Sequence, residues 1–198
     1  MKRGGILELV LIVVTAVGLA LAVQAWAVKP YQIPSESMEP TLDIGQRVLV
    51  NRVFTRLGSD PSPGDVVVFH PPQGALDGDK CGAPTRSGEP CPEPTSDEAD
   101  ENFIKRVVAG PGDMLKIENG IPIVNGEPFT GDWEIRPCRG VGSCDFPQQI
   151  TIPPDHYFMM GDNRGASDDS RYWGPVPRDW IVGQAFFTYW PPDRIGIL

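Results

Sequence analysis

The sequence predicts a mostly β domain of antiparallel sheets, preceded by one apolar N-terminal helix. One continuous apolar run lies near the N-terminus, over residues 6–28. The later hydrophobic segments are short, mostly rich in β-branched or aromatic residues and bounded by turn residues such as Gly, Pro or Asn-Gly, which is typical of strands joined by tight turns. The chain has 198 residues, enough for one domain with a hydrophobic core.

The apolar run is long enough to cross a membrane. As a helix it would extend roughly 34 Å at 1.5 Å per residue. Lys2 and Arg3 precede it, and a basic flank favours the cytoplasmic side. We therefore expect a cytoplasmic N-terminus (1–5), a single transmembrane anchor (6–28) and an extracytoplasmic domain (29–198).

A cleaved secretory signal peptide is the alternative interpretation of the same run. Ala25-Trp26-Ala27 resembles a signal-peptide cleavage site. The apolar run is longer than the usual hydrophobic region of such a peptide, however, and this favours an uncleaved anchor. We expect no second span, because the later hydrophobic runs are short and alternate with polar residues.

The portion expected outside the membrane is acidic. Lys2, Arg3 and Glu8 are the charged residues of the first 28, so the chain from Lys29 onward has 15 basic and 25 acidic residues and a formal charge of −10. A surface of that charge repels phosphate groups. Nucleic acid is therefore excluded as a class of partner.

Four cysteines lie in this portion: Cys81, Cys91, Cys138 and Cys144. Disulfides persist outside the cytoplasm, and among three possible connectivities the short spacings favour Cys81 with Cys91 and Cys138 with Cys144. A zinc site is the alternative, but the chain has no CxxC pair and its two histidines stand apart. We expect no metal and no cofactor.

Strands are expected at the β-branched or apolar runs 47–53, 64–69, 103–108, 157–160 and 181–190. Asn-Gly pairs at 119–120 and 125–126 predict a β-meander, because Asn-Gly favours two-residue hairpin turns. This meander and a cysteine-bearing loop over 130–150 form a predicted insertion over 114–150. Residues 70–101 are rich in Pro, Gly and acid without periodicity, and we expect a surface loop insertion stapled by the first disulfide.

Two serines lie just beyond the apolar run, in Pro34-Ser35-Glu36-Ser37-Met38-Glu39-Pro40. Proline fixes its own φ and biases the preceding residue away from helix. We therefore expect an extended, stiff segment that could hold an attacking hydroxyl. A linker next to the membrane is the alternative, and the segment alone does not decide between them.

An activated serine needs a base. Histidine is a poor candidate, because His70 precedes two prolines and His156 precedes an apolar strand, positions typical of turns and rims. Of the five lysines, Lys105 alone lies inside an apolar strand, between Phe103 and Val108. Burial lowers the pKa of a lysine and favours its neutral form. The alternative is a strand-edge lysine whose ammonium group reaches water.

The segment from Gly161 to Gly174 combines Asp, Asn, Ser and Arg, as a tightly turned, hydrogen-bonded loop does. Asp169 and Arg171 could form an ion pair that holds this loop. A calcium-binding loop is the alternative, but Arg164 and Arg171 in the same segment oppose a dication. We expect a structural loop that also orients a catalytic group.

Taken in order, these segments resemble the bacterial type I signal peptidases, membrane-anchored serine endopeptidases with a Ser/Lys dyad. The resemblance covers nearly the whole chain and rests on four motifs: the Ser37 segment, Gly64-Asp65-Val66-Val67, Lys105-Arg106-Val107 leading to Gly110-x-Gly112-Asp113, and Gly161-Asp162-Asn163-Arg164-x-x-Ser167-x-Asp169-Ser170-Arg171. It implies a LexA-like β catalytic domain of coiled antiparallel sheets. The chain departs from some members in having one expected span rather than two, and in the acidic insertion at 70–101.

The resemblance also implies residue roles. Ser37 would be the nucleophile and Lys105 the general base, while Ser35 would donate to the oxyanion beside the Ser37 backbone N–H. Ser167 would bind and orient Lys105, and Asp169 and Arg171 would hold that loop. Small apolar pockets for alanine-like side chains would lie near Ile33, Pro34, Met38, Leu42 and Ile104.

The implied activity is cleavage of Ala-x-Ala signal peptides from secretory preproteins, bound as an added β-strand, at the outer face of the cytoplasmic membrane. Expected partners are preproteins and membrane lipid, with the secretion translocon as a further candidate. One alternative is a catalytically inactive, membrane-tethered β module that binds exported proteins. Another is a self-cleaving LexA-like regulator, which would need a DNA-binding segment and a cytoplasmic location.

Overall fold

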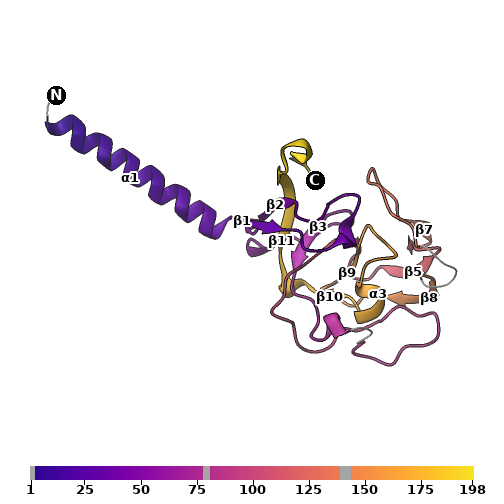
Figure 1. Cartoon of the computed structure of the whole chain (residues 1–198). Coiled ribbons are helices and arrows are strands. Elements are labelled where there is room, and N and C mark those ends of the chain that lie inside the picture. The colour runs from indigo at the N-terminus through magenta and orange to yellow at the C-terminus, as the bar shows by residue number, and fades with distance from the viewer. Residues whose placement is uncertain (1–2, 78–80, 139–143) are drawn as a thin grey trace.

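The structure, a computed structural model, describes residues 3–77, 81–138 and 144–198. One helix leads into a domain of two antiparallel sheets (Figure 1), so the mostly β prediction is confirmed. Parts of three predicted segments lie outside the described residues: 1–2 of the N-terminal segment, 78–80 of the acidic insertion and 139–143 of the second cysteine loop.

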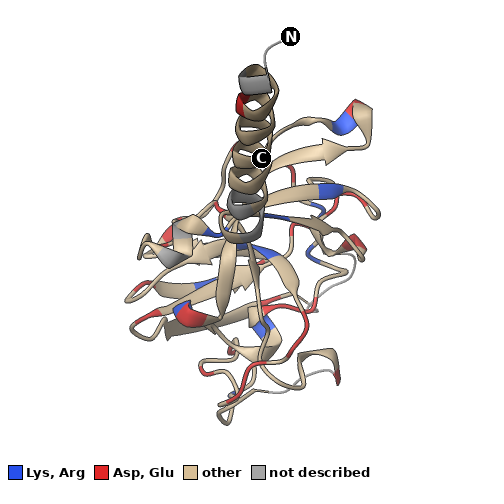
Figure 2. Ribbon diagram, turned by 90° about the vertical axis from the view of Figure 1, so that its left-hand side faces the viewer, with Lys and Arg blue, Asp and Glu red and all other residues tan. Residues whose placement is uncertain are grey.

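Helix α1 covers Arg3–Trp26 and extends away from the domain (Figure 1). Leu, Val and Ala dominate its sequence, and Figure 2 shows almost no charge along it. It ends before the predicted run does, because Val28 already pairs with Asn51 in the first strand. Within the described part of the chain, no helix has the combination of length and hydropathy that a membrane span requires. The transmembrane anchor therefore stays a prediction.

The large sheet has eight strands in the order β1-β2-β11-β3-β4-β9-β10, with β12 beside β11. They are β1 (Val28–Gln32), β2 (Arg47–Asn51), β3 (Val66–Phe69), β4 (Phe103–Ala109), β9 (His156–Met160), β10 (Val176–Pro177), β11 (Ile181–Trp190) and β12 (Gly196–Ile197). All five runs predicted as strands form strands, and all pairings in the sheet are antiparallel. Strand β4 is buried along almost its whole length, because β3 and β9 pair with its two edges and core clusters cover its faces.

The small sheet has the order β7-β6-β5-β8. Its strands are β5 (Met114–Glu118), β6 (Ile121–Val124), β7 (Glu127–Pro128) and β8 (Phe146–Thr151). Asn119 and Asn125 both have positive φ, 52° and 53°, as the first residue of a tight Asn-Gly hairpin turn requires. The predicted meander is confirmed. Strand β8 corrects the loop predicted over 130–150: it was missed because only Ile150 among its residues is fully buried.

The remaining elements are short. They comprise α2 (Val53–Arg56), α3 (Ser170–Trp173) and the 3-10 turns η1 (Glu36–Met38), η2 (Ala75–Asp77), η3 (Arg178–Trp180) and η4 (Pro192–Arg194). Because α2 follows directly after β2, the predicted strand 47–53 ends at Asn51. Both predicted disulfides, Cys81–Cys91 and Cys138–Cys144, are present.

Candidate active site

The Ser37 segment turns back on itself at its centre. Ser35 and Glu39 have extended backbone conformations, but residues 36–38 form the 3-10 turn η1, in which the Glu39 N–H donates to the Glu36 carbonyl at 3.0 Å. The prediction of an extended segment is therefore wrong at its centre, because a proline restricts only itself and the residue before it. Met38, the last residue of the turn, is completely buried, and this anchors the turn that carries Ser37.

Lys105 reaches the Ser37 hydroxyl from β4, where it pairs with Val67 of β3. Its Nζ donates to Ser37 Oγ at 2.6 Å, and the Oγ of Ser35 lies 3.3 Å from the same Ser37 oxygen. The Ser37 and Lys105 side chains are almost inaccessible, at 5% and 4% exposed. The alternative of a lysine that reaches water is excluded.

Burial changes the acidity of Lys105. Removal of the ammonium group from water lowers the pKa of Lys105 from 10.5 to about 8. The negative charges of Asp169 and Asp168 act in the opposite direction and favour the ammonium form. At pH 7, a pKa of about 8 leaves roughly a tenth of the lysine neutral, so a base is available beside a hydroxyl.

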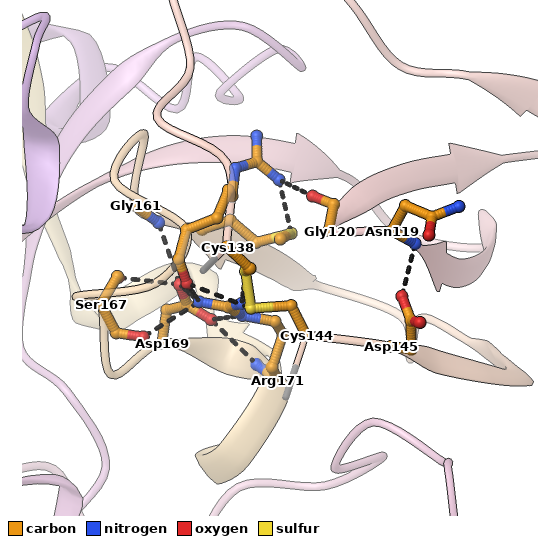
Figure 3. The surroundings of a disulfide bond; sticks show 11 residues. Asn119, Gly120, Cys138, Cys144, Asp145, Gly161, Ser167, Asp169 and Arg171 are labelled. Carbon is orange, nitrogen blue, oxygen red and sulfur yellow. Dashed lines mark hydrogen bonds and ion pairs between the residues drawn. A yellow bond between two sulfur atoms is a disulfide. The ribbon is translucent and has the colours of Figure 1, made fainter. Parts of the chain in front are cut away.

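Next to this pair, the loop after β9 is held by the predicted Asp169–Arg171 ion pair. Both side chains are fully buried, and the Arg171 Nε donates to Asp169 Oδ1 at 2.7 Å (Figure 3). Burial alone would raise the pKa of Asp169, but the Arg171 charge and several hydrogen bonds hold it below its ordinary value. Two of those bonds come from the Gly161 N–H, at 3.0 Å, and the Ser167 hydroxyl, at 2.8 Å. Because the Ser167 hydroxyl donates to Asp169, its role toward Lys105 stays a prediction.

A second buried pair, Arg106–Asp162, supports the Ser37 turn. Arg106 Nε and Nη2 donate to the two carboxylate oxygens of Asp162 at 2.9 and 2.6 Å, and the Thr41 hydroxyl donates to the same carboxylate at 2.6 Å. The next residue, Asn163, also holds the Ser37 turn, because its N–H donates to the Ser37 carbonyl at 3.1 Å. Sequence reasoning assigned no role to these residues, although both charged groups lie within the quoted motifs.

The cysteine loops pack against the same loop. The Cys91 N–H donates to the Arg171 carbonyl at 3.0 Å, and Cys144 Sγ lies 3.6 Å from the Arg164 carbonyl. Figure 3 shows the Cys138–Cys144 bridge beside Arg171. The buried Arg164 guanidinium, whose pKa burial lowers to about 10, donates to the Gly120 carbonyl at 3.0 Å in the β5–β6 turn. The small sheet and both disulfides therefore brace the loop near Lys105.

A mainly apolar cavity of about 450 Å³ adjoins the two serines and the lysine. Its lining residues come from the Ser37 segment, the start of β4, the loop after β9 and the acidic insertion: Pro34, Ser35, Ser37, Leu76, Glu101, Asn102, Phe103, Ile104, Lys105, Ala166 and Asp168. Pro34 and Ile104 thus line a cavity next to Ser37, and their place in a substrate pocket stays a prediction. Ile33, Met38 and Leu42 do not line the cavity but lie in the core cluster behind it, together with Ile104.

The histidines have local roles. His70 Nδ1 lies 3.2 Å from the Ala99 carbonyl and 3.1 Å from the Glu101 carbonyl, and His156 Nδ1 lies 2.7 Å from the Pro154 carbonyl. These contacts fit the turn and rim positions predicted for both. Across the ranges that the structure describes, no group of three or more His, Cys, Asp or Glu side chains could hold a metal ion.

Comparison with known proteins gives consistent matches. The model of a family described as signal peptidase, peptidase S26, matches residues 6–190. The probable signal peptidase I-2 of Synechocystis sp. is 34% identical over 193 residues, which is 97% of this chain and 77% of that protein. The signal peptidase I of Mycobacterium tuberculosis is 33% identical over an alignment of 233 residues, covering 100% of this chain and 76% of the relative.

Two further matches are more partial. The probable thylakoidal processing peptidase 2 of Arabidopsis thaliana is 34% identical over 185 residues, 92% of this chain and 43% of that protein. Among solved structures, a signal peptidase I from Enterococcus faecalis aligns with 64% of this chain and 97% of its own, with a TM-score of 0.43 and 22% identity.

Proposed function

The chain belongs to the signal peptidase family, peptidase S26, and we propose that it is a type I signal peptidase with Ser37 as nucleophile and Lys105 as general base. The observation that carries this proposal is the 2.6 Å hydrogen bond between Lys105 Nζ and Ser37 Oγ in a nearly inaccessible setting. A lysine whose pKa is lowered to about 8 has the neutral population that a general base needs.

In the acylation step, Ser37 Oγ attacks the carbonyl carbon of the scissile peptide and its proton passes to neutral Lys105 Nζ. The carbonyl electrons move onto oxygen, and the Ser35 hydroxyl would donate to this oxyanion. The protonated Nζ then gives its proton to the leaving amine nitrogen as the C–N bond breaks. The N-terminal fragment remains bound to Ser37 as an ester.

In the deacylation step, Lys105 takes a proton from water as the water oxygen attacks the ester carbonyl. The ester bond breaks, Ser37 Oγ recovers a proton from Nζ, and the carboxylic acid product leaves. Ser167 would orient Lys105 through both steps, and the Asp169–Arg171 pair supports that arrangement by fixing the Ser167 loop. Loss of the Ser35 hydroxyl is expected to lower kcat by on the order of 10² to 10³.

We propose secretory preproteins with Ala-x-Ala cleavage sites as substrates. The cavity lined by Pro34 and Ile104 offers apolar walls for small side chains next to Ser37. An extended leader could bind there by backbone hydrogen bonds as an added strand. The apolar sequence of residues 6–28 supports a single-pass anchor with the N-terminus in the cytoplasm and the β domain outside. Protease digestion of right-side-out vesicles would remove the β domain if this topology is correct.

The test is cleavage of a model preprotein with an Ala-x-Ala site by the full-length protein in lipid. We expect Ser37→Ala and Lys105→Met each to abolish cleavage. Ser62→Ala and Lys116→Met are matched controls, because Ser62 is exposed and Lys116 lies in the small sheet, where it pairs with Glu118. Full activity of Lys105→Met, or no cleavage by the wild type, would contradict the proposal, and the second result would favour a binding module.

A further inference from the structure

The acidic insertion contributes one apolar side chain to the cavity beside Ser37. This side chain belongs to Leu76, the central residue of η2. Leu76 is 64% exposed. A single exposed leucine is ordinary on a protein surface, but this one lines the cavity that also contains the Ser37 and Lys105 side chains.

Leu76 has a fixed place because its neighbour is part of the core. Ala75 is buried in the cluster that contains Phe69 and Trp173. The backbone around Leu76 is closed by two turn hydrogen bonds, from the Ala75 N–H to the Pro72 carbonyl at 3.0 Å and from the Asp77 N–H to the Gly74 carbonyl at 2.9 Å. The leucine therefore projects from a turn that is tied to the domain.

The two ends of the insertion are also tied together. The Gln73 N–H donates to the Asp97 carbonyl and the Ala99 N–H to the Pro71 carbonyl, each at 2.8 Å. His70, at the start of the insertion, also contacts the Ala99 and Glu101 carbonyls at its end. These bonds hold η2 beside the start of β4, the strand that carries Lys105.

Leu76 also separates the cavity at Ser37 from a second one. The second cavity has a volume of about 350 Å³ and shares Leu76 and Glu101 with the first. Its other walls are formed by the insertion itself, including Asp77, Glu98 and Asp100. A peptide that runs from the first cavity toward the second would meet the leucine side chain, which lines both.

We propose that Leu76 is a specificity-determining residue that forms an apolar subsite for one side chain of the substrate close to the scissile bond. The inference rests on the proposed function, because it concerns the peptide that this site would cleave. The side chain would be an aliphatic or aromatic one, since Leu76 itself is apolar and Phe103 lines the same cavity. The insertion, on this view, serves to place Leu76 against the substrate.

A double-mutant cycle between enzyme and substrate tests the proposal. Each model preprotein would carry either Leu or Ser at one residue near the cleaved bond, and the two alanines of the cleavage site would stay unchanged. The kcat/KM of every substrate would be measured with wild type and with Leu76→Ser. At one position, Leu76→Ser is expected to lower kcat/KM for the Leu substrate about tenfold and to leave the Ser substrate unchanged. That selective loss is a coupling between the two side chains.

Leu57→Ser is the matched control, because Leu57 is 72% exposed and does not line either cavity. Leu57→Ser should leave kcat/KM unchanged for both the Leu and the Ser substrates. Leu76→Met should retain the preference, and urea unfolding should show all three variants to be as stable as wild type, since surface changes of this kind cost little. An equal effect of Leu76→Ser at every position, or no effect at any, would overturn the subsite. Either result would leave Ser37-dependent cleavage intact, whereas failure of the proposed function would remove cleavage altogether.

Discussion

Two buried Asp–Arg pairs support the site, and they differ in what they do to Lys105. Arg106–Asp162 and Arg171–Asp169 each bring a guanidinium within 3 Å of a carboxylate that is fully buried. Among the charges that act on the pKa of Lys105, Asp169 raises it most, Arg171 lowers it, and Asp162 has the smallest effect of the four that act. The pair at Asp169 is therefore both structural and electrostatic.

The pair at Asp162 acts mainly by holding neighbouring segments of the chain together. Its carboxylate binds Thr41 as well as Arg106, and Arg106 also donates to the Gly64 carbonyl at 2.7 Å. Arg106 stacks on Trp133, whose ring centroid lies 4.3 Å from the guanidinium carbon. This pair thus ties the segment after Ser37 to the large sheet. The comparison indicates that the Asp162 pair mainly holds the Ser37 segment in position, whereas the Asp169 pair both holds its loop and acts on the pKa of Lys105.

Removal of one carboxylate from each pair is expected to have the largest effects. Asp169→Asn leaves Arg171 buried opposite a neutral amide and should lower the free energy of unfolding by about 3–5 kcal/mol. Asp162→Asn should cost less than Asp169→Asn, because Asp169 also accepts from the buried Gly161 N–H and Ser167 hydroxyl, whereas Asp162 accepts from the part-buried Thr41 hydroxyl. Urea unfolding measures both.

Glu118→Gln is the control for these two variants. Glu118 forms an exposed pair with Lys116, and exposed pairs of this kind contribute about 0–1 kcal/mol. If Asp162→Asn destabilised the protein more than Asp169→Asn, our ranking of the two buried pairs would be wrong.

The next effect in size concerns Gly161, which immediately precedes Asp162 in the chain. A Cβ atom at this position would lie 2.3 Å from Ser167 Oγ and 2.4 Å from the Ser37 carbonyl oxygen. Gly161→Ala must therefore push the Ser167 loop and the Ser37 turn apart. Because a displacement of about 1 Å can cost on the order of 10² in rate, we expect a loss of that size in kcat/KM for the model preprotein. Gly196→Ala, with nothing within 4 Å of its added Cβ, should be neutral, and similar rates for the two variants would contradict the close approach.

Much of the fold could be predicted because its signals are local. The bounds predicted for strand β11 match the observed ones, since an apolar and aromatic run extends over most of its length. Both Asn-Gly hairpins were predicted from two residues each. Strand β8 was missed because most of its side chains face solvent and only its pairing with β5 identifies it.

The site could be predicted only as far as local motifs and the family resemblance allowed. Asp169 and Arg171 are two residues apart, so their pairing was visible in the sequence. Arg106 and Asp162 are 56 residues apart, and they meet only because β4 pairs with β9 in a register that sets Arg106 opposite Met160. The contribution of Leu76 to the cavity depends in the same way on the closure of a long loop, which has no sequence pattern.

The smallest expected effect is a shift in the pH profile of kcat/KM, which distinguishes the two pairs by their electrostatic action on Lys105. Since neutral Lys105 is the proposed base, kcat/KM should rise with pH and level off above about 8, the pKa of Lys105 in the folded protein. Asp169→Asn removes the charge that most favours the ammonium form, so the rising limb should move to lower pH. Asp162→Asn should move it less. Equal shifts in the two pH profiles would show that both pairs act on Lys105 alike.

The same pKa has a consequence for stability that provides an independent measurement. Lys105 titrates at about 8 when folded and at 10.5 in an unperturbed chain, so between these values the unfolded state binds more protons than the folded state. The free energy of unfolding should therefore rise with pH across this window, and below it the buried ammonium should lower stability by a constant amount. Lys105→Met should lose this rise and be more stable than wild type at pH 7. An unchanged pH dependence in Lys105→Met would show that burial does not lower the pKa of Lys105, and the base would then have to gain its neutral form only when substrate binds.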